Sequence, residues 1–264
     1  MCGRFVVASS PQLLVDRFGG EENAVGEREP DYNVTPRAIV PVVRERRPRR
    51  EDREDREDRE GREAADPETA VPAPTTRVLS PLRWGLVPSW AENPAIGDRM
   101  INARAETVAT AKSYQRAFRA RRCIVPADAF YEWLKVEQPG SKKPVRIPWV
   151  VRRRDGEPLA FAGLWEIWRD ESVADRDAPD AWLRTCAIVT TRANDLLARV
   201  HNRMPVVLGE DTWDRWLDPM FDDVATLSSF LEPAPDEWFE TYEVSPRVNR
   251  PENNDARLLD PVGS

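Results

Sequence analysis

Short apolar runs bounded by proline and glycine, rather than long amphipathic helices, recur along this chain and most constrain its fold. They are rich in Val, Ile, Trp and Phe, which are favoured in strands. The runs lie at 38–43, 79–87, 123–125, 149–151, 159–164 and 185–190. Helical patterns lie at 11–18, 105–119, 194–200, 212–217 and 224–231. Because the two kinds do not alternate strictly, we expect an α+β fold: a single domain with a mostly antiparallel, barrel-like β core flanked by helices.

A strongly charged stretch interrupts this pattern. Residues 44–63 contain nine arginines and nine acidic residues, with no large apolar side chain. Such a sequence cannot bury enough apolar surface to offset the entropy of ordering it. We expect residues 44–77 to form a flexible insertion; the alternative is a solvent-projecting helix with Glu and Arg paired at i,i+3. The domain is expected to span residues 2–250, with residues 251–264 as a tail.

The formal net charge of -7 by itself disfavours a nucleic-acid partner, but the charge is unevenly distributed. Residues 209–264 contain 14 acidic and 4 basic residues, a net of -10, which leaves +3 for residues 1–208. Residues 99–122 contain seven basic residues and one acidic residue, a net of +6. This basic segment is a candidate phosphate-binding face. A solvated helix side is the alternative, and charge alone favours it.

Cysteine usage and hydropathy indicate the compartment. No apolar run approaches the roughly 18 residues of a membrane-spanning helix, and no secretory signal is visible, so we expect a soluble protein without a membrane partner. The cysteines, Cys2, Cys123 and Cys186, are odd in number and widely spaced, which favours a reducing cytoplasm. A zinc site of these cysteines and His201 lacks paired ligand spacing, so neither a metal nor another cofactor is expected. No phosphate-binding glycine loop or serine nucleophile motif is present.

Cys2 is the position with the most distinctive chemistry. Removal of the initiator methionine would leave an α-amine and a thiol on adjacent carbons, with reference pKa values of about 7.7–8.0 and about 8.5. An amine attacks an aldehyde to form a Schiff base. The neighbouring thiol can then close onto the imine carbon as a five-membered thiazolidine. The alternative is that a cysteine stands at position 2 by chance and has no chemical role.

Other residues offer proton transfer and stacking. His201 is the only histidine, and its surroundings predict a loop. Glu132 lies among aromatic residues, where desolvation would raise its pKa; the alternative is a carboxylate on the polar face of a strand, paired with an arginine. Asn102 stands where a loop is expected to enter a helix, which favours an N-cap. Trp84 and Trp90 are core residues or, beside turns, stacking faces for unpaired bases.

Six separated sequence blocks, in this order, together resemble the SOS response-associated peptidase family from residue 2 to about residue 250. They are Met1-Cys2-Gly3-Arg4-Phe5, Tyr32-Asn33-Val34-Thr35-Pro36, Trp84-Gly85-Leu86-Val87-Pro88, Asn102-Ala103-Arg104-Ala105-Glu106-Thr107, Phe130-Tyr131-Glu132-Trp133 and His201-Asn202-Arg203-Met204-Pro205. The charged insertion and the acidic C-terminal part depart from compact members of the family.

The resemblance implies that Cys2 crosslinks to the ring-opened aldehyde of an abasic site in single-stranded DNA through a thiazolidine. It implies that Asn102 orients the sugar or the terminal amine, Glu132 manages protons, and His201 acts as acid or base. The same groups would catalyse reversal of the crosslink. Contacts to DNA are implied for six further residues: Arg4, Asn33, Trp90, Arg104, Lys112 and Thr190.

Two other functions remain open at this stage. Cys2, Glu132 and His201 could form a peptidase of the N-terminal-nucleophile type that removes Met1 autocatalytically. A non-covalent single-strand binding module would need only basic and aromatic residues. We expect a cytoplasmic monomer that is nucleoid-associated when bound to DNA, and no replication-fork partner is identified.

Overall fold

The computed structural model describes residues 2–46, 75–140 and 144–263, and its strands form two sheets. The smaller sheet has the order β13-β9-β8-β1-β3. The larger follows the path β12-β11-β10-β7-β4-β5-β2, with β6 paired to β11. The strand bounds are β1 Phe5–Val7, β2 Glu22–Asn23, β3 Asp31–Val34, β4 Ile39–Arg46, β5 Thr76–Trp84, β6 Asn102–Arg104, β7 Arg122–Ala127, β8 Ala129–Val136, β9 Val145–Arg153, β10 Leu159–Arg169, β11 Trp182–Arg192, β12 Arg203–Pro205 and β13 Phe239–Glu243.

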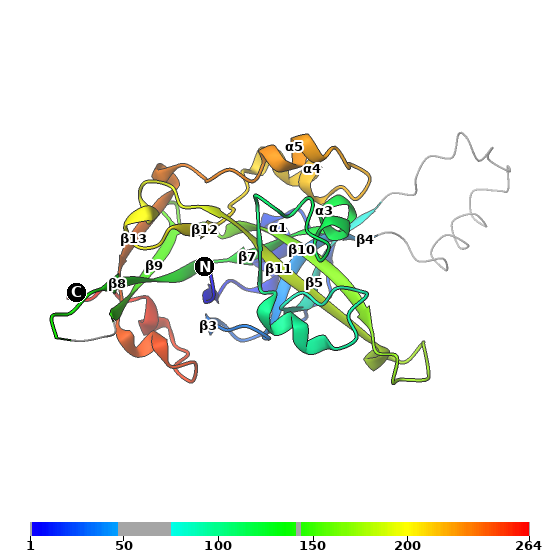
Figure 1. Cartoon of the computed structure of the whole chain (residues 1–264), viewed down its shortest axis with the longest axis horizontal. Coiled ribbons are helices and arrows are strands. Elements are labelled where there is room, and N and C mark those ends of the chain that lie inside the picture. Colours follow the sequence, from blue (N-terminus) through cyan, green and yellow to red (C-terminus); the bar gives the residue numbers. More distant parts are fainter. Residues whose placement is uncertain (1, 47–74, 141–143, 264) are drawn as a thin grey trace, which may run out of the picture.

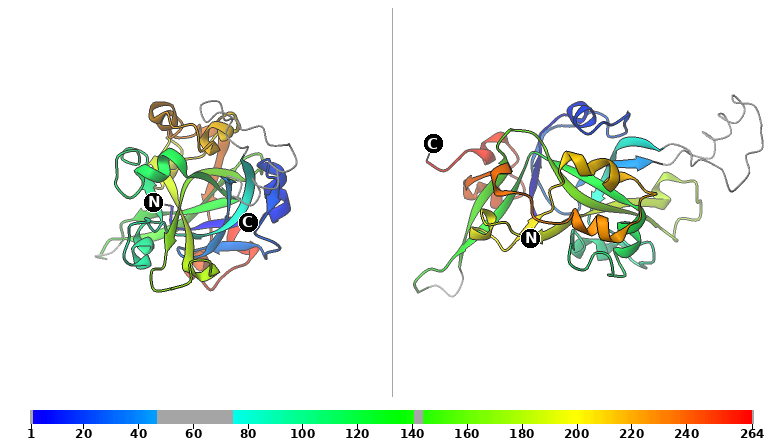
Figure 2. Two further views of the ribbon diagram at one scale, coloured as in Figure 1. Left: turned by 90° about the vertical axis from the view of Figure 1, so that its right-hand side faces the viewer. Right: turned by 90° about the horizontal axis from the view of Figure 1, so that it is seen from above.

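The larger sheet closes into a barrel. Along β5-β4-β7-β10-β11 all neighbours are antiparallel, and the ring is completed by a parallel pairing in which Thr185 and Cys186 of β11 face Arg83 and Trp84 of β5. Figures 1 and 2 show the short helices at the outside of this ring. The expected α+β fold with a mostly antiparallel, barrel-like core is therefore confirmed, and each of the six apolar runs forms all or part of a strand.

Aromatic side chains fill the region between the two sheets. Phe5 packs edge-on against Trp84, with ring centroids 4.9 Å apart, and against Phe161, which also contacts Phe130. Trp84 is fully buried and its indole N–H donates to the carbonyl of Ile101 over 2.9 Å. Of the two tryptophans considered as stacking faces, Trp84 is therefore a core residue.

The helices are short. They are α1 Pro11–Arg17, α3 Gln115–Ala120, α4 Trp213–Leu217 and α5 Val224–Ser229, with 3-10 turns including η1 Pro94–Arg99 and η3 Leu197–Arg199. The helix expected over 105–119 is wrong for most of its length, because residues 105–112 form successive turns after β6. No helix in the described ranges is long and apolar enough to cross a bilayer.

The edges of the expected insertion belong to the barrel. The β4–β5 ladder continues to the pair Arg46 and Thr76. Ion pairs hold it there: Arg46 with Glu22 at 2.7 Å, and Arg77 with Glu45 at 2.9 Å. The expectation of an insertion over 44–77 is therefore wrong at residues 44–46 and 76–77, and its remaining part, 47–74, lies outside the described residues.

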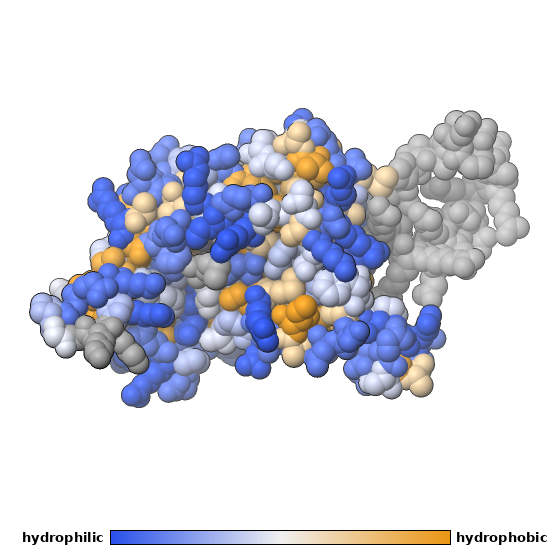
Figure 3. Space-filling view, in the orientation of Figure 1, coloured by the Kyte–Doolittle hydropathy of each residue, from blue (hydrophilic) through white to orange (hydrophobic). Residues whose placement is uncertain are grey.

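The segment after residue 250 packs on the smaller sheet. Leu258 is fully buried in a cluster with Val6, Val150 and Val248. The backbone N–H of Tyr32 donates to the side chain of Asn254 over 2.6 Å. The β8–β9 hairpin projects beyond this region (Figure 1), and the face in Figure 3 is mostly hydrophilic with small separate hydrophobic spots.

Candidate active site

Cys2 lies at the entry to β1, fully buried between the two sheets. The register of β1 and β8 pairs Phe5 with Phe130, and continuing it places Gly3 opposite Glu132. Burial, followed by the nearby Glu132 carboxylate, raises the pKa of the Cys2 thiol well above its ordinary value. The thiol is therefore protonated at neutral pH and loses its proton only to a base beside it.

Asn102 holds the backbone of Cys2. Its side-chain amide donates to the Cys2 carbonyl over 2.8 Å. Asn102 lies on β6, which pairs in parallel with β11 through Ile188, so the expected helix N-cap is wrong. Tyr114 donates its hydroxyl to the Asn102 carbonyl over 3.0 Å. The other side-chain atom of Asn102, Oδ1, is buried and accepts no hydrogen bond within the described part of the chain, which leaves it available to a donor at Cys2.

Glu132 lies on β8, and the residue is only 5% exposed. Burial raises its pKa, while the electrostatic effect of His201 opposes that rise. Both a thiol and an imidazole thus lie close enough to Glu132 to interact with it electrostatically. A carboxyl group between a thiol and an imidazole is placed to accept and return a proton.

His201 lies in the loop between η3 and β12, as expected from the sequence. Its Nδ1 atom accepts from the backbone N–H of Arg203 over 3.0 Å. Arg203 in turn donates to the carbonyl of Thr190 over 2.6 Å and binds both carboxylate oxygens of Glu106, one of them at 3.0 Å. With Nδ1 held by the loop, Nε2 is the ring nitrogen suited to proton transfer.

The sequence motifs contained Arg203 and Glu106, but sequence reasoning gave neither a role. Their pairing joins the turn after β6 to β12, and so fixes the loop of His201 relative to Asn102. The signal available in the sequence was their opposite charge, since Arg203 and Glu106 each lie within one of the six sequence blocks. The fold thus gathers Cys2, Asn102, Glu132 and His201 from four different elements.

Comparisons with known proteins show the family of the whole chain. The model of the family described as SOS response associated peptidase (SRAP) matches residues 1–251. The chain belongs to the SRAP family. The abasic site processing protein YoqW of Bacillus subtilis is 35% identical over 263 residues, covering 98% of this chain and 99% of YoqW. The abasic site processing protein HMCES of Mus musculus is 27% identical, covering 99% of this chain and 76% of its own.

Solved structures share the SRAP fold seen here. A protein from Bacteroides thetaiotaomicron superposes with a TM-score of 0.75 at 20% identity, covering 98% of this chain and 99% of that one. At this identity the likeness concerns the fold alone. The resemblance drawn from the six sequence blocks is confirmed.

Trp90 and Lys112, two residues with an implied DNA contact, lie side by side. Trp90 is 50% exposed, and the Lys112 ammonium lies 5.0 Å from the centroid of its ring. A cavity of about 480 Å³ adjoins Trp90 and is also lined by Arg99. Arg104 is exposed on β6, directly across from the buried Thr190 of β11. An exposed aromatic face beside ammonium and guanidinium groups suits an unpaired base and its phosphates.

Arg4 and Asn33 are placed differently. Asn33 is 4% exposed, and its amide donates to carbonyls of the C-terminal segment, including that of Asn253 over 2.7 Å. Arg4 donates to Asn33 over 2.6 Å and to the carbonyl of Val248 over 2.9 Å. A phosphate contact by Asn33 would require this segment to move. Its DNA contact, like the others, stays a prediction.

The basic segment 99–122 is divided by the fold. Arg104 lies on β6 with Asn102, and Lys112 packs over Trp90, whereas Arg116 and Arg121 line a separate cavity. Arg122 is buried and donates to backbone carbonyls, including those of Trp216, Phe118 and Phe221. The net charge of +6 is therefore spread over more than one surface.

The remaining cysteines take no part in a site. Cys123 on β7 and Cys186 on β11 are buried on either side of β10, and burial raises the pKa of both thiols. Within the described residues, no group of three or more His, Cys, Asp or Glu side chains is placed to hold a metal ion.

Proposed function

We propose that this SRAP protein binds single-stranded DNA containing abasic sites and crosslinks to them through Cys2 after Met1 is removed. The observation that carries the proposal is the convergence on Cys2: Asn102 holds its carbonyl, and Glu132 interacts with its thiol and with His201. The names of YoqW and HMCES as abasic site processing proteins support the substrate class.

The chemistry needs no external oxidant or reductant. The neutral α-amine of Cys2 attacks the C1′ aldehyde of the open sugar, and loss of one water molecule gives an imine. The thiol then adds across the carbon–nitrogen double bond, so that sulfur bonds to carbon and the thiol proton passes to nitrogen. Glu132 carries that proton, and His201 assists opening of the sugar ring and departure of water.

Ring closure explains how the lesion would be protected. An imine activates the neighbouring proton of the sugar and so promotes β-elimination and strand cleavage. The thiazolidine has no imine, so this route is closed. Proton return from Glu132 to sulfur would reopen the ring, which makes the same residues suitable for crosslink reversal. We further propose that the protein acts as a cytoplasmic monomer, nucleoid-associated when bound to DNA.

A denaturing gel tests the proposal. Purified protein incubated with single-stranded DNA containing one abasic site should give a slowly migrating, heat-stable band. Cys2→Ala should abolish this band, whereas the matched control Cys123→Ala, at another buried cysteine, should retain it. Cys2→Ser should lose the stable adduct, because oxygen closes the ring less favourably than sulfur.

Other outcomes would favour a different function. Salt-sensitive binding that is indifferent to Cys2 would indicate a non-covalent binding module. Peptide cleavage without a DNA adduct would indicate a peptidase. Mass spectrometry that finds Met1 retained in crosslinking-competent protein would rule out the aminothiol mechanism.

A further inference from the structure

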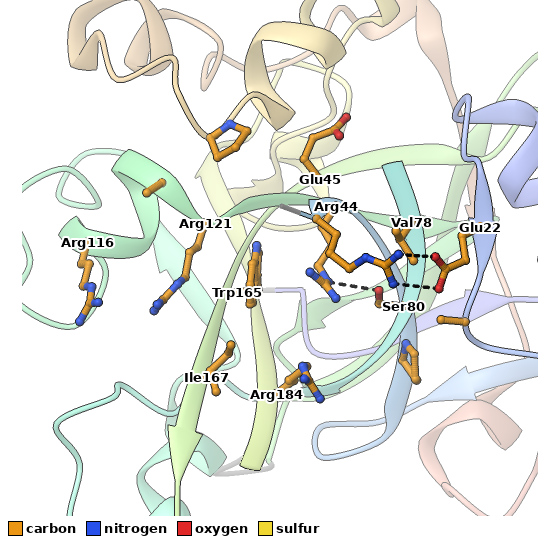
Figure 4. Close-up of a pocket in the computed structure, with 15 residues that line it drawn as sticks. Glu22, Arg44, Glu45, Val78, Ser80, Arg116, Arg121, Trp165, Ile167 and Arg184 are labelled. Atoms are coloured by element: carbon orange, nitrogen blue, oxygen red, sulfur yellow. Dashed lines mark hydrogen bonds and ion pairs between the residues drawn. The ribbon is translucent and has the colours of Figure 1, made fainter. Parts of the chain in front are cut away.

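A cavity of about 680 Å³ lies apart from the candidate active site. None of Cys2, Asn102, Glu132 and His201 lines it. It is bounded by β4, β5, β10, β11 and the end of α3. Figure 4 shows Trp165 between the side chains of Arg121 and Arg44, with Arg184 below them and Arg116 farther from the ring. The charged residues that line it are Glu22, Arg44, Glu45, Arg46, Arg116, Arg121 and Arg184.

The two glutamates of this cavity are already paired. Glu22 binds Arg46 through two contacts of 3.0 and 2.7 Å, and Glu45 binds Arg77 at 2.9 Å. Arg121 forms an ion pair with Glu166, which does not itself line the cavity. Three further arginines of the wall make no ion pair with any residue that the structure describes: Arg44, Arg116 and Arg184.

Arg44 shows that positive charge is in excess here. Its guanidinium carbon lies 4.8 Å from the centroid of the Trp165 ring, and its Nε donates to Ser80 over 3.1 Å. Burial lowers its pKa to about 10, and the positive charges of Arg184 and Arg46 contribute to that shift. Arg121 lies over the same indole at 5.6 Å. Like charges gathered around one ring repel each other until an anion enters.

We propose that this cavity binds a terminal phosphate group, a phosphomonoester or pyrophosphate, through Arg44, Arg116 and Arg184. Guanidinium groups match phosphate oxygens in geometry and remain charged at neutral pH. A dianion offsets more of the repulsion than a phosphodiester with one charge. The volume lies within the 300–1,000 Å³ typical of small-molecule sites, and Val78 and Ile167 supply apolar walls.

Calorimetry with inorganic pyrophosphate at constant ionic strength tests the site. Wild type should show saturable binding, and Arg184→Gln and Arg44→Gln should each bind about tenfold more weakly, or worse, for the loss of a charge-assisted hydrogen bond. The matched control Arg119→Gln, on the exposed side of α3, should bind as wild type does. No saturable binding to wild type, or equal binding to all variants, would overturn the proposal.

Thermal unfolding distinguishes a ligand site from a structural cluster. Because Arg44→Gln relieves repulsion, its melting temperature without ligand should equal or exceed that of wild type. Pyrophosphate should raise the melting temperature of wild type but not that of the Arg44→Gln, Arg184→Gln double variant. If Arg44→Gln does not fold, Arg184→Glu at an exposed position provides the same comparison. A pyrophosphate shift retained in the double variant, or in Arg184→Glu, would contradict the site.

Competition identifies the source of the phosphate. Displacement of pyrophosphate by a 5′-phosphorylated oligonucleotide, but not by its 5′-hydroxyl counterpart, would assign the group to a DNA end. Displacement by neither would assign it to a free small molecule. Displacement by both would overturn the proposal, since the cavity would then be binding internal phosphodiesters.

Discussion

Glu132 on β8 is almost completely buried, and its carboxyl group interacts with two reactive residues from other elements, Cys2 and His201. Desolvation raises its pKa above that of an exposed glutamate, so that at a given pH more of it carries a proton. Sequence reasoning found this residue from its aromatic surroundings. It also found Cys2 and His201, because an N-terminal aminothiol and a single histidine are visible without a fold. It missed Arg203, because its partner Glu106 is nearly 100 residues away and the pairing exists only in the folded chain.

Removing the ionisable group from Glu132 should slow the reaction without removing the nucleophile. We expect Glu132→Gln to crosslink abasic DNA about 10²–10⁴-fold more slowly, the usual contribution of a general acid–base. Quench-flow or timed gels would measure the rate, with Glu171→Gln, an exposed surface variant, as the control. A rate unchanged from wild type would refute the proton-transfer role.

The same substitution should change the pH dependence of stability. The folded pKa of Glu132 lies above the unfolded value of about 4.3. Its contribution to stability is therefore fully present below that value and is lost as pH rises through the folded pKa. Since the amide that replaces the carboxyl group does not ionise, the free energy of unfolding of Glu132→Gln relative to wild type should rise from pH 4 to pH 8. Urea unfolding at both pH values would check this, and a pH-independent difference would contradict it.

Gly85, at the end of β5, sets the approach of the loop that carries Trp90. Its φ of +124° is rarely adopted by other residues, and a Cβ there would lie 2.6 Å from the carbonyl oxygen of Gly97 in η1. The Trp-Gly-Leu-Val-Pro block thus contains a glycine that the close backbone contact requires. Gly97 meets the same restriction in return, since its own Cβ would lie 2.6 Å from the carbonyl of Gly85.

We expect Gly85→Ala to lower the free energy of unfolding by about 2–4 kcal/mol, through backbone strain and overpacking together. Gly26→Ala is a matched control, because Gly26 also has a positive φ but nothing lies within 4 Å of its Cβ position. It should cost only about 1 kcal/mol. Chemical denaturation of both variants would measure the difference, and equal losses would show that the contact with Gly97 is unimportant.

Elements differ in how far sequence predicts them. The barrel strands were predictable because short runs rich in Val, Ile and Phe, bounded by proline and glycine, favour strands over buried helices. Asn102 was misassigned, because its pairing with β11 depends on a strand more than 80 residues later, and local capping chemistry suggested a helix instead. The turns at 105–112 follow from that pairing, which leaves α3 only the residues from Gln115 onward.

For the whole molecule, the position of charge matters more than its sum. The net charge of -7 hides exposed basic residues such as Arg104 and Lys112, the second of which lies over Trp90; these exposed residues are here called the basic face. The barrel-like sheet was predictable, but the parallel β5–β11 pairing that closes it and the division of residues 99–122 between two surfaces were not, since both depend on contacts distant in sequence. The sequence shows that residues 99–122 are basic, but it does not show toward which surface each arginine side chain points.

Salt dependence of DNA binding should report this local charge. We expect Lys112→Ala to weaken binding of unmodified single-stranded DNA at low salt and to reduce the slope of log affinity against log salt by about 0.7, the value for one phosphate contact. Lys135→Ala, an exposed lysine on β8 outside the basic face, is the matched control and should leave the slope unchanged. Fluorescence anisotropy at several salt concentrations would measure both, and identical slopes would place the DNA elsewhere.

Closure of the barrel through β5 and β11 also bears on biosynthesis. The paired residues Arg83 and Thr185 are about 100 positions apart, so a growing chain cannot complete the ring until most of it has left the ribosome. High contact order of this kind slows folding. Cys2 emerges first, but β6 and the loop of His201 acquire their positions only when β11 is available. Cys2 should therefore be synthesised before Asn102 and His201 reach their positions beside it. Nascent chains should react with an abasic-site aldehyde only inefficiently.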